Sequence, residues 1–291
     1  MKRFFCFLIF SFVFFLIFVS GCTFFEQSFE KGRFIFENDP PIYFGVFPFL
    51  EKEILSEGFN PLLKYLSHHL HKKVQIKFAE NYSSLEELAL KKKIHFMWFN
   101  TRKRSKSEKL ILEPLCRPIS EEGSYYRGII IAKKASGLSK ISDLAGKTFA
   151  YIDPISNSGF VYPNELFKKM NIEPTSFFGE IKFTGNHDKC LNGVLNGDYD
   201  AGVVTDMFFK NTGRFQNPSN SELEIIASTS KILLDPFVSI VGLERGLKTK
   251  IIELLTDPEK YDESGPAFAK LFTAFGIKGF EKLTSLDEVD K

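Results

Sequence analysis

The chain has 291 residues, of which 44% are hydrophobic and 25% charged, and its formal net charge is +2. This composition is typical of a folded globular protein, and the small net charge excludes the broad basic surface by which proteins hold nucleic acid through its phosphates. We therefore expect no nucleic acid partner. Beyond the N-terminal segment about 250 residues remain, enough for one large domain or two of ordinary size.

The N-terminal segment has the pattern of an export signal. Lys2 and Arg3 precede an apolar run over residues 4–19, which is short for a membrane-spanning helix. The run closes on Ser-Gly-Cys at residues 20–22, which resembles the lipobox of bacterial lipoproteins. In those proteins the signal is cleaved before the cysteine, here Cys22, and the cysteine is acylated, so the resemblance implies a lipid anchor to the membrane. An uncleaved anchor with an incidental cysteine is the alternative.

Cleavage would remove a signal peptide of residues 1–21 and leave residues 22–40 as a tether. The mature chain would then hold 36 basic and 36 acidic residues, because two basic residues and no acidic residue leave with the signal. An anion site would have to be built locally, without a global positive field. Of the other cysteines, Cys116 and Cys190 remain, and an exported compartment permits a disulfide between them; two buried free thiols are the alternative.

Strand and helix patterns alternate after the tether. Short apolar runs typical of buried strands are followed by segments whose apolar residues recur at helical spacing. The expected strands are residues 42–47, 74–78 and 94–99, and the expected helices are residues 60–70 and 83–92. This alternation predicts a mostly parallel sheet with helices on both faces.

A long strand-like run at residues 125–133 interrupts the alternation, which then restarts. The expected strands are residues 147–152, 180–183, 201–204, 224–227 and 236–241, and the expected helices are residues 163–170, 187–195, 249–255 and 267–275. The pattern predicts an α/β protein with two doubly wound lobes joined by crossing strands. We expect residues 41–125 plus 235–291 in lobe 1 and residues 126–234 in lobe 2, with a ligand cleft at the strand ends between them.

The most distinctive local sequence is FAYIDPISNSGFVYP, at residues 149–163. An apolar run leads into a polar tetrad and then into a helical pattern, and the tetrad is Ser156, Asn157, Ser158 and Gly159. This order predicts a strand, a tight turn and a helix N-terminus, where backbone N–H groups and the positive end of the helix dipole favour an oxyanion. An ordinary helix cap without a ligand is the alternative.

Three blocks of sequence, at residues 126–163, 183–206 and 233–242, resemble the PhnD-like family of substrate-binding proteins. These proteins are receptors of ABC importers for phosphonate, phosphite or phosphate, and the similarity extends over residues 41–243. It implies a type II periplasmic-binding-protein fold in the cell envelope, two lobes that close over a small oxyanion, and no catalysis. It also implies partners, an ABC permease and its ATPase. We expect a monomer with no cofactor and no metal site.

The resemblance assigns the anion to the tetrad, where Asn157 stands in place of the usual threonine. It also assigns His187, which lies in a block similar to the family's Gly-x-His-Glu/Asp segment, although a surface capping histidine is the alternative. Asp206 matches an acidic residue that binds the amine of aminoalkyl phosphonates in some members, although a solvated acid at a strand end is the alternative.

The expected contributions of lobe 1 follow the third strand. Phe99 replaces a tyrosine of the family whose hydroxyl can touch the ligand, and Asn100 is a plausible hydrogen-bond donor. Phe47 and Phe49 are candidates to line the cleft. Tyr126 is a candidate ligand contact, and packing at the hinge is its alternative.

Two alternative functions remain open. The first is a sensor or partner-binding lipoprotein with the same fold and a different ligand, which the replacements at Phe99 and Asn157 suggest. The second is a hydrolase that uses Ser158 with His187 and Asp206, but the sequence has no Gly-x-Ser-x-Gly elbow and no phosphate-loop lysine to support it.

Overall fold

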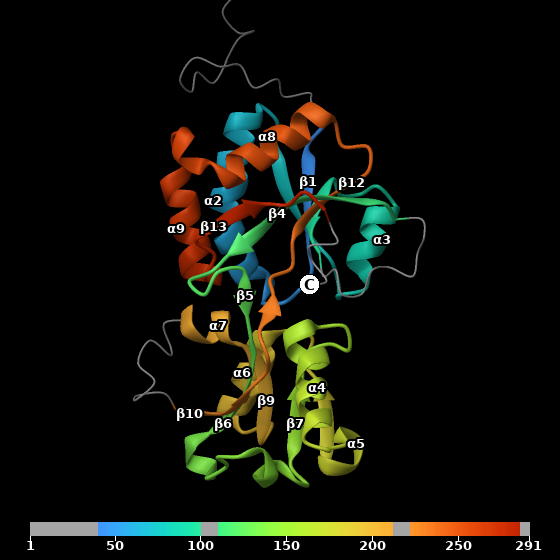
Figure 1. The fold of residues 1–291 in the computed structure, drawn as a ribbon, viewed down its shortest axis with the longest axis vertical. Helices are drawn as coiled ribbons and strands as arrows, with labels where there is room; N and C mark the ends of the chain where they lie inside the picture. The colour runs from blue at the N-terminus through green and yellow to red at the C-terminus, as the bar shows by residue number, and fades with distance from the viewer. Residues whose placement is uncertain (1–39, 100–109, 212–221, 286–291) are drawn as a thin grey trace, which may run out of the picture. The chain divides into compact units, whose positions relative to one another are not determined.

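The computed structural model describes residues 40–99, 110–211 and 222–285 (Figure 1). The expected signal peptide, the tether up to residue 39, Cys22 and Asn100 lie outside the described residues. Within the described ranges, no helix combines the length and the hydrophobicity that crossing a bilayer requires.

Six strands form the first sheet, in the order β13-β4-β12-β3-β1-β2. Strand β1 runs parallel to β2 and β3, whereas β12 is antiparallel to β3 and β4, and β13 is antiparallel to β4. The sheet is therefore mixed, and the expectation of a mostly parallel sheet was wrong because β12 enters it from the opposite direction after the chain returns from the second sheet. The strands are β1 (Ile42–Val46), β2 (Val74–Phe78), β3 (Phe96–Trp98), β4 (Leu112–Ile119), β12 (Phe237–Ile240) and β13 (Gly279–Lys282).

Helices cover the first sheet with apolar faces. The helices are α2 (Lys52–Leu70), α3 (Ser84–Leu90), α8 (Arg245–Thr256) and α9 (Ser264–Phe275). Helix α2 begins eight residues before the expected start, because Leu55 and Phe59 extend its buried face by two turns. It therefore contains Pro61 in its interior. Helices α2 and α9 pack closely at Gly58, where a Cβ atom would collide with the ring of Phe275.

The second sheet has five strands in the order β10-β6-β9-β7-β8. Strand β7 is parallel to β8 and β9, and β6 is antiparallel to β9 and β10. The strands are β6 (Gly128–Lys133), β7 (Thr148–Tyr151), β8 (Glu180–Phe183), β9 (Ala201–Thr205) and β10 (Leu223–Ser228), and the accompanying helices are α4 (Tyr162–Lys169), α5 (Pro174–Phe177), α6 (His187–Asn196) and α7 (Asp206–Asn211).

A two-stranded sheet lies where the chain passes between the two larger sheets (Figure 1). It pairs β5 (Tyr125–Tyr126) with β11 (Ile232–Leu233) in antiparallel fashion. The expected single strand over residues 125–133 is thus two strands, β5 and β6. They separate at Arg127, whose backbone N–H donates to the carboxylate of Asp206 at 2.9 Å and so leaves the strand ladder.

The two cysteines of the described residues are buried free thiols. Cys116 lies in β4 and Cys190 in α6, on elements that accompany different sheets. Burial raises the pKa of the Cys116 thiol, and it raises the pKa of Cys190 to about 12, so both thiols stay protonated and unreactive at neutral pH. The sequence left open a disulfide or two buried free thiols, and the structure contains the free thiols.

Candidate functional site

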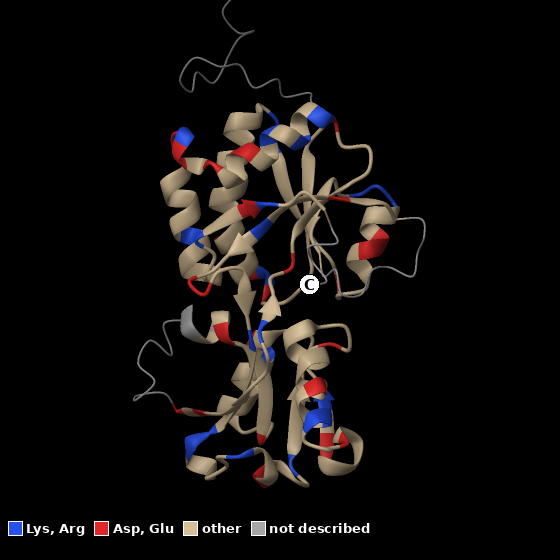
Figure 2. Ribbon diagram, viewed as in Figure 1, with Lys and Arg blue, Asp and Glu red and all other residues tan. Residues whose placement is uncertain are grey.

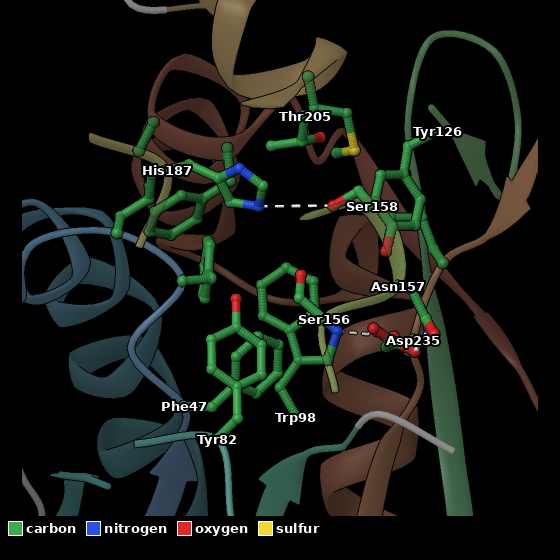
Figure 3. Close-up of a pocket in the computed structure, with 16 residues that line it drawn as sticks. Phe47, Tyr82, Trp98, Tyr126, Ser156, Asn157, Ser158, His187, Thr205 and Asp235 are labelled. Carbon is green, nitrogen blue, oxygen red and sulfur yellow. Dashed lines mark hydrogen bonds between the residues drawn. The ribbon is translucent and has the colours of Figure 1, made fainter. Parts of the chain in front are cut away.

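A cavity of about 60 Å³ lies beside the two-stranded sheet (Figure 3). One water needs roughly 10–15 Å³ of such space, so the cavity has room for about four to six non-hydrogen atoms. This is the size of a small tetrahedral anion. The polar lining residues are Ser156, Asn157, Ser158, His187, Thr205 and Asp235, and the aromatic and apolar ones are Phe47, Phe49, Leu50, Tyr82, Trp98, Tyr126, Met207, Leu234, Ala274 and Phe275.

The polar tetrad forms the helix start that the sequence predicts. Strand β7 ends shortly before it, and a single wide helical turn at Asn157–Val161 leads into α4. The Ser156 hydroxyl caps this turn by accepting the N–H of Gly159 at 3.1 Å. Gly159 does not line the cavity, but a Cβ atom there would collide with Ile152, so glycine lets the turn pack against the end of the strand.

Four hydroxyl groups converge on the cavity from both sides. Ser156 and Ser158 come from the tetrad, and Figure 3 shows the hydroxyls of Tyr82 and Tyr126 directed toward them. Burial raises the pKa of both tyrosines, and hydrogen bonds with Ser156 and Ser158 oppose this only in part. Both phenols therefore keep their protons at neutral pH and can donate hydrogen bonds.

His187 is the first residue of α6 and is only 2% exposed, so it is not the surface capping residue that was its alternative. Its Nε2 atom lies 3.4 Å from the hydroxyl of Ser158. Burial lowers the pKa of the imidazole to about 3, which makes the ring neutral at neutral pH when no anion is bound. A neutral imidazole can still donate one hydrogen bond to an anion.

Two polar atoms of lining residues are buried without a hydrogen-bond partner in the described part of the chain. They are Nδ1 of His187 and Oγ1 of Thr205. A buried polar atom left unpaired destabilises a fold by about 1–3 kcal/mol, and such atoms often mark a place where a ligand or water binds. Both atoms belong to residues of the cavity lining, so a polar ligand or water that reached them from the cavity would satisfy them.

Asp235 brings a carboxylate into the same cavity. The Asn157 amide donates to this carboxylate at 3.2 Å, and the Trp98 indole N–H donates to the Asp235 backbone carbonyl at 2.7 Å. No Lys or Arg is among the described residues that line the cavity. Figure 2 shows acidic and basic residues interspersed over the helices and strand ends, so a bound anion would depend on local donors and not on a basic face.

The structure brings together most of the residues that the sequence singled out. Ser156, Asn157, Ser158, His187 and Tyr126 all line the cavity. The aromatic candidates Phe47 and Phe49 line it as well.

Besides Gly159, two candidates lie outside the cavity lining. The Asp206 carboxylate accepts a hydrogen bond from the backbone N–H of Arg127. Asp206 lines a smaller pocket that is separate from the cavity. Phe99 is buried in the core, outside the cavity lining, where its N–H donates to the Pro236 carbonyl. With Asp206 held at the β5–β6 junction and Nδ1 of His187 unpartnered, the described residues do not assemble the acid–histidine–serine contact of a triad hydrolase.

Among the lining residues that the sequence analysis missed, three carry a hydroxyl or carboxyl group, namely Tyr82, Thr205 and Asp235. Asp235 stands between an apolar run and a proline in the third block, LLDPFVSIVG, and an isolated acid in such a run is a usable signal. Thr205 directly precedes Asp206 at the end of β9, where the position of the strand end was predicted correctly within one residue.

The lowered pKa of His187 predicts a pH-dependent stability. Below pH 6.5 the unfolded chain binds a proton at this residue, whereas the folded ligand-free protein does not until about pH 3, so folding stability falls as pH drops between these values. In His187→Gln this loss between pH 7 and pH 4.5 should be smaller. Urea unfolding at the two pH values measures it, with His68→Gln at an exposed position as the control. An equal loss in His187→Gln and the parent protein would contradict the burial of a neutral imidazole.

A family model described as "ABC transporter, phosphonate, periplasmic substrate-binding protein" matches residues 44–288. The chain is 25% identical over 169 residues to the "Phosphate-import protein PhnD" of Mycolicibacterium smegmatis, a match that covers 54% of this chain and 53% of that protein. The chain thus spans about half the length of this relative. It is 24% identical over 204 residues to the "Probable ABC transporter phosphite binding protein PhnD1" of Prochlorococcus marinus, which covers 66% of this chain and 67% of that protein.

A solved structure, PhnD1 from Prochlorococcus marinus in complex with methylphosphonate, aligns with a TM-score of 0.72 and 19% identity. The alignment covers 85% of this chain and 96% of that one, which shows that the fold is that of a type II periplasmic binding protein. The match of the family model over most of the sequence extends this from the fold to the family. The chain belongs to the family of periplasmic substrate-binding proteins of phosphonate ABC transporters.

Proposed function

We propose that this protein is the substrate-binding receptor of an ABC importer and that it binds a phosphorus oxyanion in the cavity of Figure 3. The observation that carries the proposal is the helix start at Ser156–Gly159 with two unpartnered buried polar atoms close by in the same lining. The names of the relatives, a phosphate-import protein and a phosphite-binding protein, support the same ligand class.

Neutral donors would hold the anion. The hydroxyls of Ser156, Ser158, Tyr82 and Tyr126 come with their protons, and Thr205 adds a hydroxyl that has no other partner. A hydrogen bond to a charged group contributes roughly 1.5–3 kcal/mol, so a few of them give useful affinity without a lysine or an arginine.

The cavity favours a phosphorus oxyanion that carries an apolar or a protonated group. The ring centroids of Phe47 and Tyr82 lie 4.8 Å apart and those of Phe47 and Phe49 lie 5.3 Å apart, so the three packed rings form a continuous apolar wall. The Asp235 carboxylate would repel a fourth charged oxygen but would accept a hydrogen bond from a P–OH or an amino group. An apolar substituent, as in methylphosphonate, therefore suits the aromatic wall, and a P–OH, as in the phosphate anions present near neutral pH, suits Asp235.

Closure, anchoring and delivery complete the proposal. Each large sheet with its helices would form one lobe, with residues 41–125 plus 235–291 in lobe 1 and residues 126–234 in lobe 2. The lobes would close about β5 and β11, because these strands carry the chain between them. The exported monomer would be held at the membrane by acyl groups on Cys22 and would deliver its ligand to a permease and ATPase without catalysing a reaction.

The tetrad is tested by replacing Ser158. Ser158→Ala should weaken binding of the preferred ligand by about 10- to 100-fold, because one donor to the anion is lost. Ser158→Asp should weaken it further, because a fixed negative charge at the helix start would repel the anion. Calorimetry with methylphosphonate, phosphite, phosphate and aminoethylphosphonate measures both, with the exposed Ser142→Ala as the control. Unchanged affinity in Ser158→Asp would place the anion elsewhere.

The proposed role of the Asp235 carboxylate in ligand selection is tested by replacing Asp235 with asparagine, which has the same shape but no charge. Asp235→Asn keeps an oxygen that can accept the Asn157 amide but removes the charged acceptor of a P–OH proton, so affinity for the phosphate dianion, which keeps one P–OH, should fall about tenfold relative to methylphosphonate, whose dianion has none. The ratio of the two dissociation constants at pH 8, where phosphate is largely doubly ionised, gives the result. A ratio equal to that of the parent protein would mean that Asp235 does not select the ligand.

The anchor is tested at Cys22. Acyl groups of a lipoprotein attach to this cysteine, so Cys22→Ala should abolish the labelling of the protein by radioactive palmitate and leave the precursor unprocessed. Cys6→Ala, within the part that cleavage would remove, is the matched control and should be labelled like the parent. Equal labelling of Cys22→Ala and the parent protein would overturn the lipoprotein assignment.

A further inference from the structure

Two helix N-termini meet beside the cavity. Helix α2, which covers the first sheet, begins after Glu51, and helix α6, which packs on the second sheet, begins after Asn186. The backbone N–H of His187 donates to the carbonyl of Phe49 at 3.0 Å. The backbone N–H of Glu51 donates to the carboxylate of Asp188 at 2.8 Å. Each helix start thus satisfies an N–H group of the other, in a place where the helix itself offers no partner.

The side chain of Glu51 adds to this junction. Its Oε1 atom accepts the amide N–H of Asn186 at 3.0 Å and lies 3.7 Å from the ammonium group of Lys189. Asn186 at the same time caps its own helix, because its Oδ1 atom accepts the backbone N–H of Lys189 at 2.9 Å. The Glu51 carboxylate is therefore held at the positive end of the α6 dipole, where a negative charge is stabilised.

The junction and the cavity share two residues. Phe49 and His187, which are joined by the backbone hydrogen bond, both line the cavity with their side chains. Separation of the two helix starts would draw the Phe49 ring away from the imidazole and open the cavity on that side. The position of one wall relative to the other consequently depends on the contacts of residues 49–51 with residues 186–189.

We propose that Glu51 is a positioning residue for ligand binding, which holds the wall around Phe49 against the start of α6 and so keeps the cavity assembled before a ligand enters. For the identity of the ligand the proposal rests on the function proposed above. The assembly of the cavity does not depend on that function and can be measured without a ligand.

A purely structural role within α2 does not account for these contacts. The Glu51 side chain makes no capping hydrogen bond to its own helix, and its recorded partners, Asn186 and Lys189, both belong to the start of α6. The ion pair with Lys189 is well exposed and contributes little by itself. The hydrogen bond from the buried Asn186 is the stronger link, since that residue is only 5% exposed.

The chain offers a reciprocal exchange that separates this contact from helix capping. Asn186→Asp keeps an oxygen to cap α6 but sets a second carboxylate against Glu51, so the two helix starts should repel each other. Adding Glu51→Gln supplies an amide that can donate to the introduced carboxylate, which restores the hydrogen bond in the opposite direction. Glu51→Ala removes the contact, and Glu53→Ala, at an exposed position in the first turn of the same helix, is the matched control.

Small-angle scattering of the ligand-free protein is the first measurement. The radius of gyration should increase in Glu51→Ala and in Asn186→Asp, and it should match the parent protein in the double variant and in Glu53→Ala. Trp98 is the sole tryptophan of the sequence and lines the cavity, so its emission should shift to longer wavelength in the same two variants as water enters. Melting temperatures and far-UV circular dichroism near those of the parent protein establish that all variants are folded.

Dissociation of methylphosphonate, followed by Trp98 fluorescence in stopped flow, is the second measurement. The dissociation rate should rise about tenfold in Glu51→Ala and Asn186→Asp and return toward the parent value in the double variant. Parent-like radii of gyration and rates in both single variants, or no restoration in a folded double variant, would overturn the proposal. If the parent protein bound no phosphorus oxyanion, the proposed function would fail, while scattering of the ligand-free variants would still decide the role of Glu51.

Discussion

The structure depends on the burial of polar groups around one small space. Removing an oxyanion from water is costly unless hydrogen-bond donors replace its hydration shell. Here the donors would be hydroxyl groups and a neutral imidazole, which the turn that leads into α4 and several other elements bring to the cavity. Because no cation is among the described lining residues and Asp235 contributes a carboxylate, the charge of the proposed oxyanion would be met by hydrogen bonds alone, and its shape and protonation state would be decisive.

The crossing of the chain explains how these groups come together. The segment after β11 leaves the two-stranded sheet and enters the first sheet as β12, and Asp235 lies between these strands. Its carboxylate thereby reaches Asn157 at the helix start that follows β7 of the second sheet. The contact between this acid on the crossing segment and the amide on the helix start places the carboxylate in the cavity lining, where we propose that it selects the ligand.

His187 connects the binding chemistry to the arrangement of the helices. Its side chain faces Ser158 in the cavity, whereas its backbone N–H donates to Phe49 on the other side of the same cavity. Burial that is complete enough to keep the imidazole neutral requires that these walls stay together. The electrostatic state of this residue and the closure of the helix starts at Glu51 and Asn186 are therefore two consequences of one packing arrangement.

Local pattern determined most of the fold. The strands β1, β2, β7 and β9 can be predicted from the sequence, because a strand that is buried on both faces consists of consecutive apolar residues. Strand β4 was missed, and Pro114 and Pro118 are atypical of a strand with neighbours on both sides; the start of α2 was also missed, and Pro61 is atypical of the helix interior in which it lies. In both cases packing against the rest of the sheet outweighed local propensity.

In the candidate site, too, local sequence determined some features and tertiary packing determined others. The sequence by itself determined the tetrad with its helix start, and the block that contains His187, because capping residues and turns act over a few positions. Only the tertiary structure decided that Asp235 and not Asp206 enters the cavity, since the Asn157–Asp235 contact joins residues 78 positions apart. The tertiary structure also decided that the His187 imidazole is neutral. The desolvation that lowers its pKa depends on all the groups that surround the side chain in space, which the residues next to it in the sequence do not determine.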